Sequence, residues 1–335
     1  MRKYLKKLTP VLTAFVFLYA SAFFAQFAPP AEAATPAKKP RVVVTIFPQY
    51  DFVRQIAGDL VELTMLLRPG SESHSFEPTP QDIMKIRNCD LFIYVGGESD
   101  AWVDRILGSM EVQNIKTLRL VDMVHPLTEE IVEGMQADHD HEPHEHDDHD
   151  HDAPHHHEDE VYDEHVWTSP KNAQHIVRTI AGALCEIDPA NEETYRANAA
   201  AYTEKLAALD ETFRSVTSGG LRRTLVFGDK FPFLYLAHRY GLTYYAAFPG
   251  CSTETEASAA TVAFLIDKVR EENIPVVFHI ELSSGRMADA ICESAGAKKA
   301  LLHSCHNISR DDFQRGVGYL ELMERNAAVL REALH

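Results

Sequence analysis

The sequence predicts an α/β protein of two parallel-sheet lobes joined by one long rigid helix, with a metal site in the cleft between the lobes. Three observations support this fold class. Short β-branched or apolar runs alternate with helical spacing twice along the chain, a helical pattern separates the two series, and a tract of histidines and carboxylates precedes that helix. Open parallel sheets bind ligands beyond the carboxyl ends of their strands, which places the site in the cleft.

Residues 1–33 have the pattern of a secretory signal peptide, with an apolar stretch at 11–24 and an Ala31-Glu32-Ala33 cleavage motif. The positive n-region consists of Arg2, Lys3, Lys6 and Lys7. We therefore expect a periplasmic or otherwise extracytoplasmic mature chain, with an uncleaved N-terminal anchor as the alternative. No cysteine follows the apolar stretch and no later segment approaches the ~20 apolar residues of a membrane span, so we expect no lipid anchor and no membrane insertion after cleavage.

Cleavage would remove four positive charges and one negative charge, which takes the formal net charge from −18 to −21. Such an acidic balance argues against nucleic acid and anionic lipid as partners and favours the attraction of cations.

The first lobe is expected over residues 41–137, because four strand patterns and three helical patterns alternate there. In chain order, the predicted strands are 42–47, 61–67, 91–95 and 116–121, and the predicted helices are 50–57, 80–87 and 102–107.

Residues 161–190 are expected to return to the first lobe, with a helix at 172–185. The linking helix is expected at 191–218 and would be about 40 Å long, which is too long for either lobe alone. The second lobe is expected over residues 222–335. Its predicted strands are 224–227, 243–247, 275–281 and 299–302, and its predicted helices are 231–239, 258–271, 286–294 and 311–334.

The tract at 138–160 contains nine histidines, eleven carboxylates and no Lys or Arg. A mixture of imidazole and carboxylate is typical of sites for borderline divalent metals such as zinc. The segment has too little apolar surface to offset its chain entropy, so we expect a disordered, exposed loop that collects metal. A solvated acidic insertion without metal is the alternative. The histidines of this auxiliary metal loop are His139, His141, His144, His146, His149, His151, His155, His156 and His157.

Three further residues fall where strands and the tract end. His74 lies in the loop after the second predicted strand, His165 lies where the tract returns to ordered sequence, and Glu281 ends a buried strand. Each taken alone is typical of an exposed loop histidine or a solvated carboxylate. Together they are two imidazoles and a carboxylate at the mouth of one proposed cleft, which favours a metal site.

Four motifs resemble the zinc/manganese-type substrate-binding proteins of metal-uptake ABC transporters. The resemblance extends from about Arg41 to the C-terminus and rests on 43–53 (VVTIFPQYDFV), 73–80 (SHSFEPTP), 164–167 (EHVW) and Gly318-Tyr319-Leu320 with Met323 and Asn326. It implies two α/β lobes bridged by a rigid helix, with one metal ion in the cleft. His74 and His165 match the family's first two histidine ligands, Glu281 matches its carboxylate position, and a His-rich loop is typical of the zinc members.

The sequence departs from the family pattern at its third histidine, because Gly228 stands where that residue is expected. The ligand set is therefore altered. Asp229, His303, His306 and His279 are the weaker candidates to replace it, whereas His238 lies in a helical pattern and is expected to have no role in binding.

We therefore expect a non-enzymatic, monomeric solute-binding protein that captures Zn²⁺ as transported ligand and delivers it to an ABC transporter permease. A manganese-binding member of the same class is the first alternative, since a site with more carboxylates would be harder. An extracellular zinc buffer or adhesin and a zinc hydrolase are the others. A hydrolase would need a general base such as Glu77 or Glu164, but no H-E-x-x-H spacing is present.

The five cysteines leave at least one thiol unpaired in an oxidising compartment. Cys89, Cys185 and Cys292 lie in apolar patterns that favour buried thiols. Cys251 and Cys305 lie in polar turns and are the candidate disulfide.

Overall fold

The computed structural model describes residues 38–73, 76–109, 115–135, 161–252 and 256–335. The predicted signal peptide and the predicted metal-collecting tract lie outside these residues. In the described residues, no helix combines the length and the apolar character that a bilayer crossing requires.

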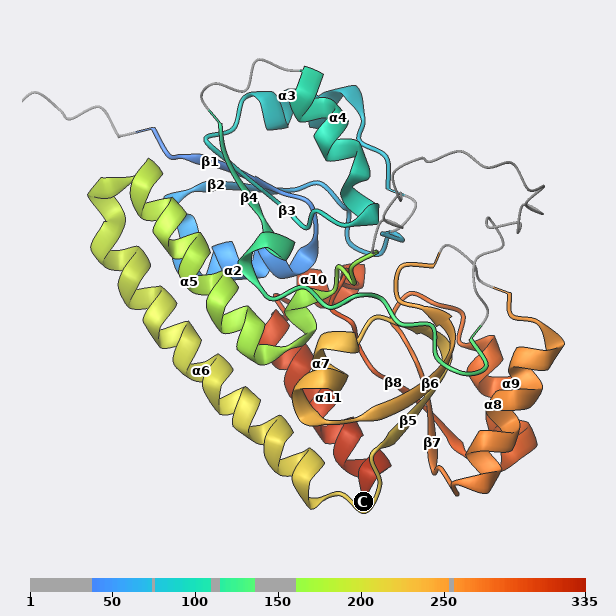
Figure 1. The fold of residues 1–335 in the computed structure, drawn as a ribbon. Helices are drawn as coiled ribbons and strands as arrows, with labels where there is room; N and C mark the ends of the chain where they lie inside the picture. Colours follow the sequence, from blue (N-terminus) through green and yellow to red (C-terminus); the bar gives the residue numbers. More distant parts are fainter. Residues whose placement is uncertain (1–37, 74–75, 110–114, 136–160, 253–255) are drawn as a thin grey trace, which may run out of the picture. The chain divides into compact units, whose positions relative to one another are not determined.

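The first sheet contains four parallel strands in the order β2-β1-β3-β4 (Figure 1). Its strands are β1 Arg41–Val44, β2 Glu62–Met65, β3 Leu91–Tyr94 and β4 Lys116–Arg119. Its helices are α2 Phe47–Ala57, α3 Pro80–Arg87, α4 Ala101–Ser109 and α5 Pro170–Ile187.

Both faces of this sheet are covered, as the continuous apolar strand patterns predict. On one face Val43 and Phe92 pack with residues of α3 and α4. On the other face Val42 and Ile93 join a core with residues of α2 and α5. The helix starts agree with the local sequence: Thr79 and Asp82 form a capping box at α3, and Ser169 caps α5 ahead of Pro170.

The second sheet is also parallel, in the order β6-β5-β7-β8. Its strands are β5 Thr224–Phe231, β6 Thr243–Pro249, β7 Val276–His279 and β8 Lys298–Leu301. Its helices are α7 Leu234–Tyr240, α8 Ala259–Glu271, α9 Arg286–Ala295, α10 Arg310–Gln314 and α11 Tyr319–Leu334. Helices α8 and α9 cover one face, whereas α7 and α11 contribute to the core on the other face.

Short 3-10 turns complete the described elements. They are Gly58–Leu60, Glu98–Asp100, Leu120–Met123, Val166–Thr168 and Pro189–Asn191.

The long helix α6, Glu192–Gly219, contacts α2 and α5 of the first lobe and α7 and α11 of the second (Figure 1). Asn198 Nδ2 donates to Ile56 O at 2.9 Å near one end. Near the other end, Asp210 accepts bonds from Arg239 and Tyr240 of the second lobe. The predicted two-lobed fold with a bridging helix is therefore confirmed, and one continuous apolar core extends into both lobes along this helix.

The last predicted helix, 311–334, is wrong as a single element. The chain instead forms α10 and α11, because Gly316 adopts a φ of +74° and Gly318 is the N-cap of α11. Asp51 of α2 accepts the Tyr319 backbone N–H at 2.8 Å, so a first-lobe carboxylate caps a second-lobe helix.

Candidate metal centre

A cleft of about 710 Å³ lies beyond the carboxyl ends of the strands. Ser71, Glu72 and Ser73 line it from the loop after β2, and the second lobe contributes residues that follow β5 and β7. His165 and His306 also line this cleft. The position agrees with the rule for ligand sites in open parallel sheets.

His165 is fully buried, and Asp163 contacts both its backbone and its ring. Asp163 Oδ1 accepts the His165 backbone N–H at 2.7 Å and lies 3.2 Å from its Nδ1. A carboxylate on one imidazole nitrogen fixes the ring and directs the other nitrogen, here Nε2, to a metal. Burial by itself lowers the pKa of His165, but Asp163 and the neighbouring Glu164 outweigh it, so this pKa is raised.

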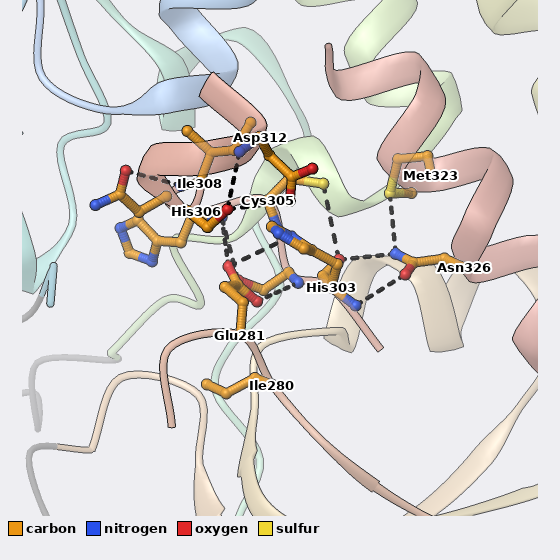
Figure 2. Close-up of polar contacts among 12 residues, drawn as sticks. Ile280, Glu281, His303, Cys305, His306, Ile308, Asp312, Met323 and Asn326 are labelled. Atoms are coloured by element: carbon orange, nitrogen blue, oxygen red, sulfur yellow. Dashed lines mark hydrogen bonds and ion pairs between the residues drawn. The ribbon is translucent and has the colours of Figure 1, made fainter. Parts of the chain in front are cut away.

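His306 is presented by the turn after β8, and Glu281 shapes that turn. One or the other Glu281 carboxylate oxygen accepts from Ser304 N at 2.7 Å, Ser304 Oγ at 2.6 Å and His306 N at 3.2 Å. Figure 2 shows these bonds, with the His306 ring pointing away from the Glu281 carboxylate. Cys305 adopts a φ of +61°, a conformation that is uncommon for residues other than glycine.

The two histidine rings meet at the cleft. Their centroids are 5.3 Å apart with an interplanar angle of 80°. Trp167 packs against both rings, and its Nε1 donates to Ser304 O at 2.8 Å. The segment carrying His165 and the turn carrying His306 are therefore joined by a direct hydrogen bond.

Glu164 completes a group of three possible ligands. One ligand atom from each of Glu164, His165 and His306 lies within 4.8 Å of the others, and all three residues are buried. Ser99 donates its backbone N–H to Glu164 Oε2 at 3.1 Å and its hydroxyl to Oε1. Burial raises the pKa of Glu164, against the effects of His165 and Ser99. The sequence had pointed to Glu164 only as a possible base, although its position beside His165 offered a signal for a ligand.

Two more acids lie near this group, the buried Asp100 and the partly buried Glu129. Burial raises the pKa of Asp100 to about 7, and its Oδ2 accepts Val95 N at 2.6 Å. Burial also raises the pKa of Glu129, whose Oε1 accepts Cys251 N at 3.0 Å. The metal end of the cleft is thus rich in carboxyl groups, which favours cation binding.

The other ligand candidates predicted from the sequence differ in where they lie relative to the cleft. His74 lies outside the described residues, although Ser73 before it lines the cleft. Asp229 lines the cleft with its carboxylate bonded to Lys230 N, Ile280 N and the Ser283 hydroxyl.

His303 and His279 differ from His306, because neither lines the cleft. His303 Nδ1 accepts Cys305 N at 3.0 Å, which makes this ring part of the turn's scaffold. His279 Nδ1 lies 3.0 Å from Ile280 O.

Gly228 has no space for a side chain. A Cβ at this position would lie 2.6 Å from Ala288 Cα and 2.7 Å from Ala288 N, at the base of α9. Packing of α9 against β5 therefore excludes a histidine at the position where the family pattern suggested one.

The predicted Cys251–Cys305 bridge is absent, since all five cysteines are free thiols and all are buried. Cys251 lies beside the carboxylates of Glu164 and Asp163, whereas Cys305 lies near Glu281 and Asp51. The two thiols therefore have different surroundings. Each cysteine backbone N–H donates to a side chain, Cys251 to Glu129 Oε1 and Cys305 to His303 Nδ1.

The fold and this site define a two-lobed α/β protein whose cleft holds a buried group of imidazole and carboxylate side chains able to bind a metal. The chain belongs to the family described as zinc-uptake complex component A, periplasmic, whose model matches residues 42–333. The recognition made from the motifs is confirmed.

Relatives agree with this family. The chain is 32% identical over 295 residues to the zinc-binding lipoprotein AdcA of Streptococcus pneumoniae, covering 88% of this chain and 56% of that protein. It is 31% identical over 299 residues to the high-affinity zinc uptake system protein ZnuA of Bacillus subtilis, covering 88% of both. The chain thus spans about half the length of the AdcA relative.

Solved structures show the same fold. The Zn(II)-bound ZnuA-like domain of S. pneumoniae AdcA is 28% identical with a TM-score of 0.71, covering 88% of this chain and 99% of that one. The metal-dependent lipoprotein YcdH of B. subtilis is 28% identical with a TM-score of 0.72, covering 89% of this chain and 100% of that one.

Proposed function

We propose that this protein captures Zn²⁺ outside the cytoplasm and delivers it to the permease of an ABC transporter. The observation that carries the proposal is the meeting of His165, His306 and Glu164 ligand atoms within 4.8 Å at the cleft. The family description and the zinc-binding relatives support the same function. Its chemistry is binding and release, without a catalysed reaction.

Zinc is favoured over manganese by the ligand types. The described part of the site contains two buried imidazoles beside one carboxylate, and imidazole suits zinc better than the harder manganese ion. His74 would supply a third imidazole, since it directly follows Ser73, which lines the cleft. Four protein ligands would then be available, which is the usual number in a closed zinc site.

We propose that His306 replaces the missing third histidine of the family and that Glu281 positions it. Three donors from the Ser304 and His306 region already occupy the Glu281 carboxylate. Glu164 then provides a carboxylate oxygen within 4.8 Å of a ring nitrogen of each histidine. In this arrangement the oxygen ligand comes from the residue next to His165 instead of from Glu281, which lies in the turn after β7.

The His-rich tract at 138–160 is proposed to collect metal for this site. Two backbone hydrogen bonds join the segment before the tract to the segment after it. Glu129 N donates to Val161 O at 2.8 Å, and Asp163 N donates to Leu127 O at 2.9 Å. His165 follows this pair of bonds by only two residues, so metal gathered by the tract would have a short path to the cleft.

The partner and location follow from the same proposal. The protein would act as an extracytoplasmic monomer, released by cleavage after residue 33, and would dock on a permease rather than on nucleic acid or lipid. A chain with a formal net charge of −18 is not suited to either polyanion.

Metal analysis followed by competition tests this function. The chain, purified without added metal, should contain zinc, and equimolar Zn²⁺ and Mn²⁺ should load it with zinc. Uptake of radioactive zinc by cells should fall when the gene is deleted and return with the wild-type chain. Preferential loading with manganese, or unchanged zinc uptake in the deletion strain, would contradict the proposal.

A further inference from the structure

Lys230 is a buried cation in the wall of the metal cleft. Its residue is 8% exposed, and its side chain lines the cleft. Among the residues that the structure describes, its Nζ has no ion pair and no hydrogen bond. Its backbone N–H donates to Asp229 Oδ1 at 2.9 Å. A largely buried lysine whose ammonium group lacks a counter-ion is unfavourable, and a cleft that binds a cation makes it more so.

Two further positive features lie on the same wall. Arg286 lines the cleft with an exposed side chain. Gly285, Arg286 and Met287 begin α9, a helix of 10 residues, and all three line the cleft. The N–H groups of a helix N-terminus attract anions. The second-lobe wall is therefore suited to a negatively charged group.

Three acidic side chains of the second lobe line this wall, Asp229, Glu256 and Glu281. Glu256 is exposed, and the other two are already bonded elsewhere. Asp229 accepts Ile280 N at 3.2 Å and the Ser283 hydroxyl, and Glu281 accepts donors from Ser304 and His306. Neither carboxylate lies within ion-pair distance of Lys230. The charge on Lys230 is therefore left for a group that enters the cleft.

The cleft is also larger than one ion requires. Its volume of about 710 Å³ is typical of a small-molecule pocket, which ranges over roughly 300–1,000 Å³. Phe248, Val262 and Met287 add apolar surface to its walls. A metal ion at His165 and His306 would leave most of this volume for a second group.

We propose that the cleft binds Zn²⁺ together with a small carboxylate-bearing chelator, such as an amino acid or a hydroxycarboxylate, whose carboxylate pairs with Lys230. This inference rests on the proposed zinc capture and specifies the form of the cargo. The chelator adds a donor to the zinc beside the protein ligands, as zinc can expand to five-coordinate. Its carboxylate pairs with the Lys230 ammonium group.

Calorimetry with citrate and with L-histidine tests this proposal on the full chain. Each chelator is titrated into zinc-loaded protein, and equilibrium dialysis measures whether zinc and chelator stay with the protein together. The wild-type chain should bind one of the two chelators only when loaded with zinc. Lys230→Met should weaken that binding by at least about tenfold, because it removes the charged partner. Lys230→Arg should retain most of it.

Lys171→Met, on an exposed residue of α5, is the control and should bind like the wild type. If Lys230→Met fails to fold, Arg286→Gln provides the comparison from an exposed position and should weaken binding severalfold. Zinc-loaded protein that binds neither chelator, loses its zinc to them, or binds them equally well as Lys230→Met would overturn the proposal. Failure to bind zinc without any chelator would instead overturn the proposed function.

Discussion

Trp167 donates its indole N–H to the carbonyl oxygen of Ser304 at 2.8 Å, and this bond links the two histidine-bearing segments of the cleft. The Trp167 carbonyl in turn accepts the Tyr319 hydroxyl at 2.6 Å, which ties the same point to α11. These two bonds join the segments that carry His165 and His306 to each other and to α11.

Trp167→Phe should destabilise the protein by about 1–3 kcal/mol beyond the loss of packing, because the buried Ser304 carbonyl loses its donor. Zinc affinity should fall as well, since His306 loses a support. Trp102→Phe is a matched control: Trp102 is also buried, but its Nε1 has no hydrogen-bond partner among the described residues. Urea unfolding and zinc titration compare the two variants, and equal losses would contradict this role of Trp167.

Gly228→Ala should destabilise the protein by at least about 2 kcal/mol, because the added methyl group would meet the Ala288 backbone at 2.6 Å. Gly182→Ala provides the contrast inside α5, where a Cβ meets nothing within 4 Å. That change should stabilise the helix by up to about 1 kcal/mol. Thermal unfolding measures both variants, and a neutral Gly228→Ala would show that α9 can move away from β5.

Asp210 should make the stability depend on pH in the acid range. Burial alone would raise its pKa, but bonds from Arg239 and Tyr240 outweigh burial, so the folded pKa is lowered. The stabilisation is complete above the unfolded value of ~3.9 and is lost as pH falls through the lower folded pKa.

Asp210→Asn should therefore be less stable than the wild type by about 2 kcal/mol at neutral pH, and the difference should vanish at strongly acid pH. Glu211→Gln, on an exposed side chain paired with Arg214, should change little at any pH. Denaturant unfolding at several pH values tests this, and a pH-independent difference would be inconsistent with a depressed Asp210 pKa.

Thiol counting should find five free sulfhydryls after unfolding without reductant, because the structure contains five free cysteines. The folded protein should react slowly, since all five are buried and burial raises the pKa of Cys251 and Cys305 well above the ordinary thiol value. A count of three free sulfhydryls would show that one disulfide is present and would contradict this prediction.

Most of the fold could be predicted from the sequence because apolar periodicity and capping residues agree along the chain. The helix at 80–87 has the predicted limits, since Thr79 and Pro80 mark its start. The break between α10 and α11 was missed, because Gly316 and Gly318 lie within an otherwise helical pattern and their conformation depends on the distant Asp51.

The site was less predictable because its geometry depends on long-range contacts. Sequence reasoning placed two of its candidates correctly in the cleft: His165, where the His-rich tract ends, and Glu281, after a buried strand. It did not distinguish His306 from His303, since the choice depends on a left-handed Cys305 and on bonds to Glu281 from 23 and 25 residues away. It also gave no sign that α9 closes the space at Gly228.

Zinc titration of a chain lacking 138–160 tests the central claim most directly. This variant should bind one Zn²⁺ tightly, and in that background His165→Ala and His306→Ala should each weaken binding by at least about a hundredfold, because each removes a buried zinc ligand. His303→Ala and Asp229→Ala should bind zinc far better than these two variants. Loss of the tight site with the tract, or unchanged affinity in both His165→Ala and His306→Ala, would contradict the account.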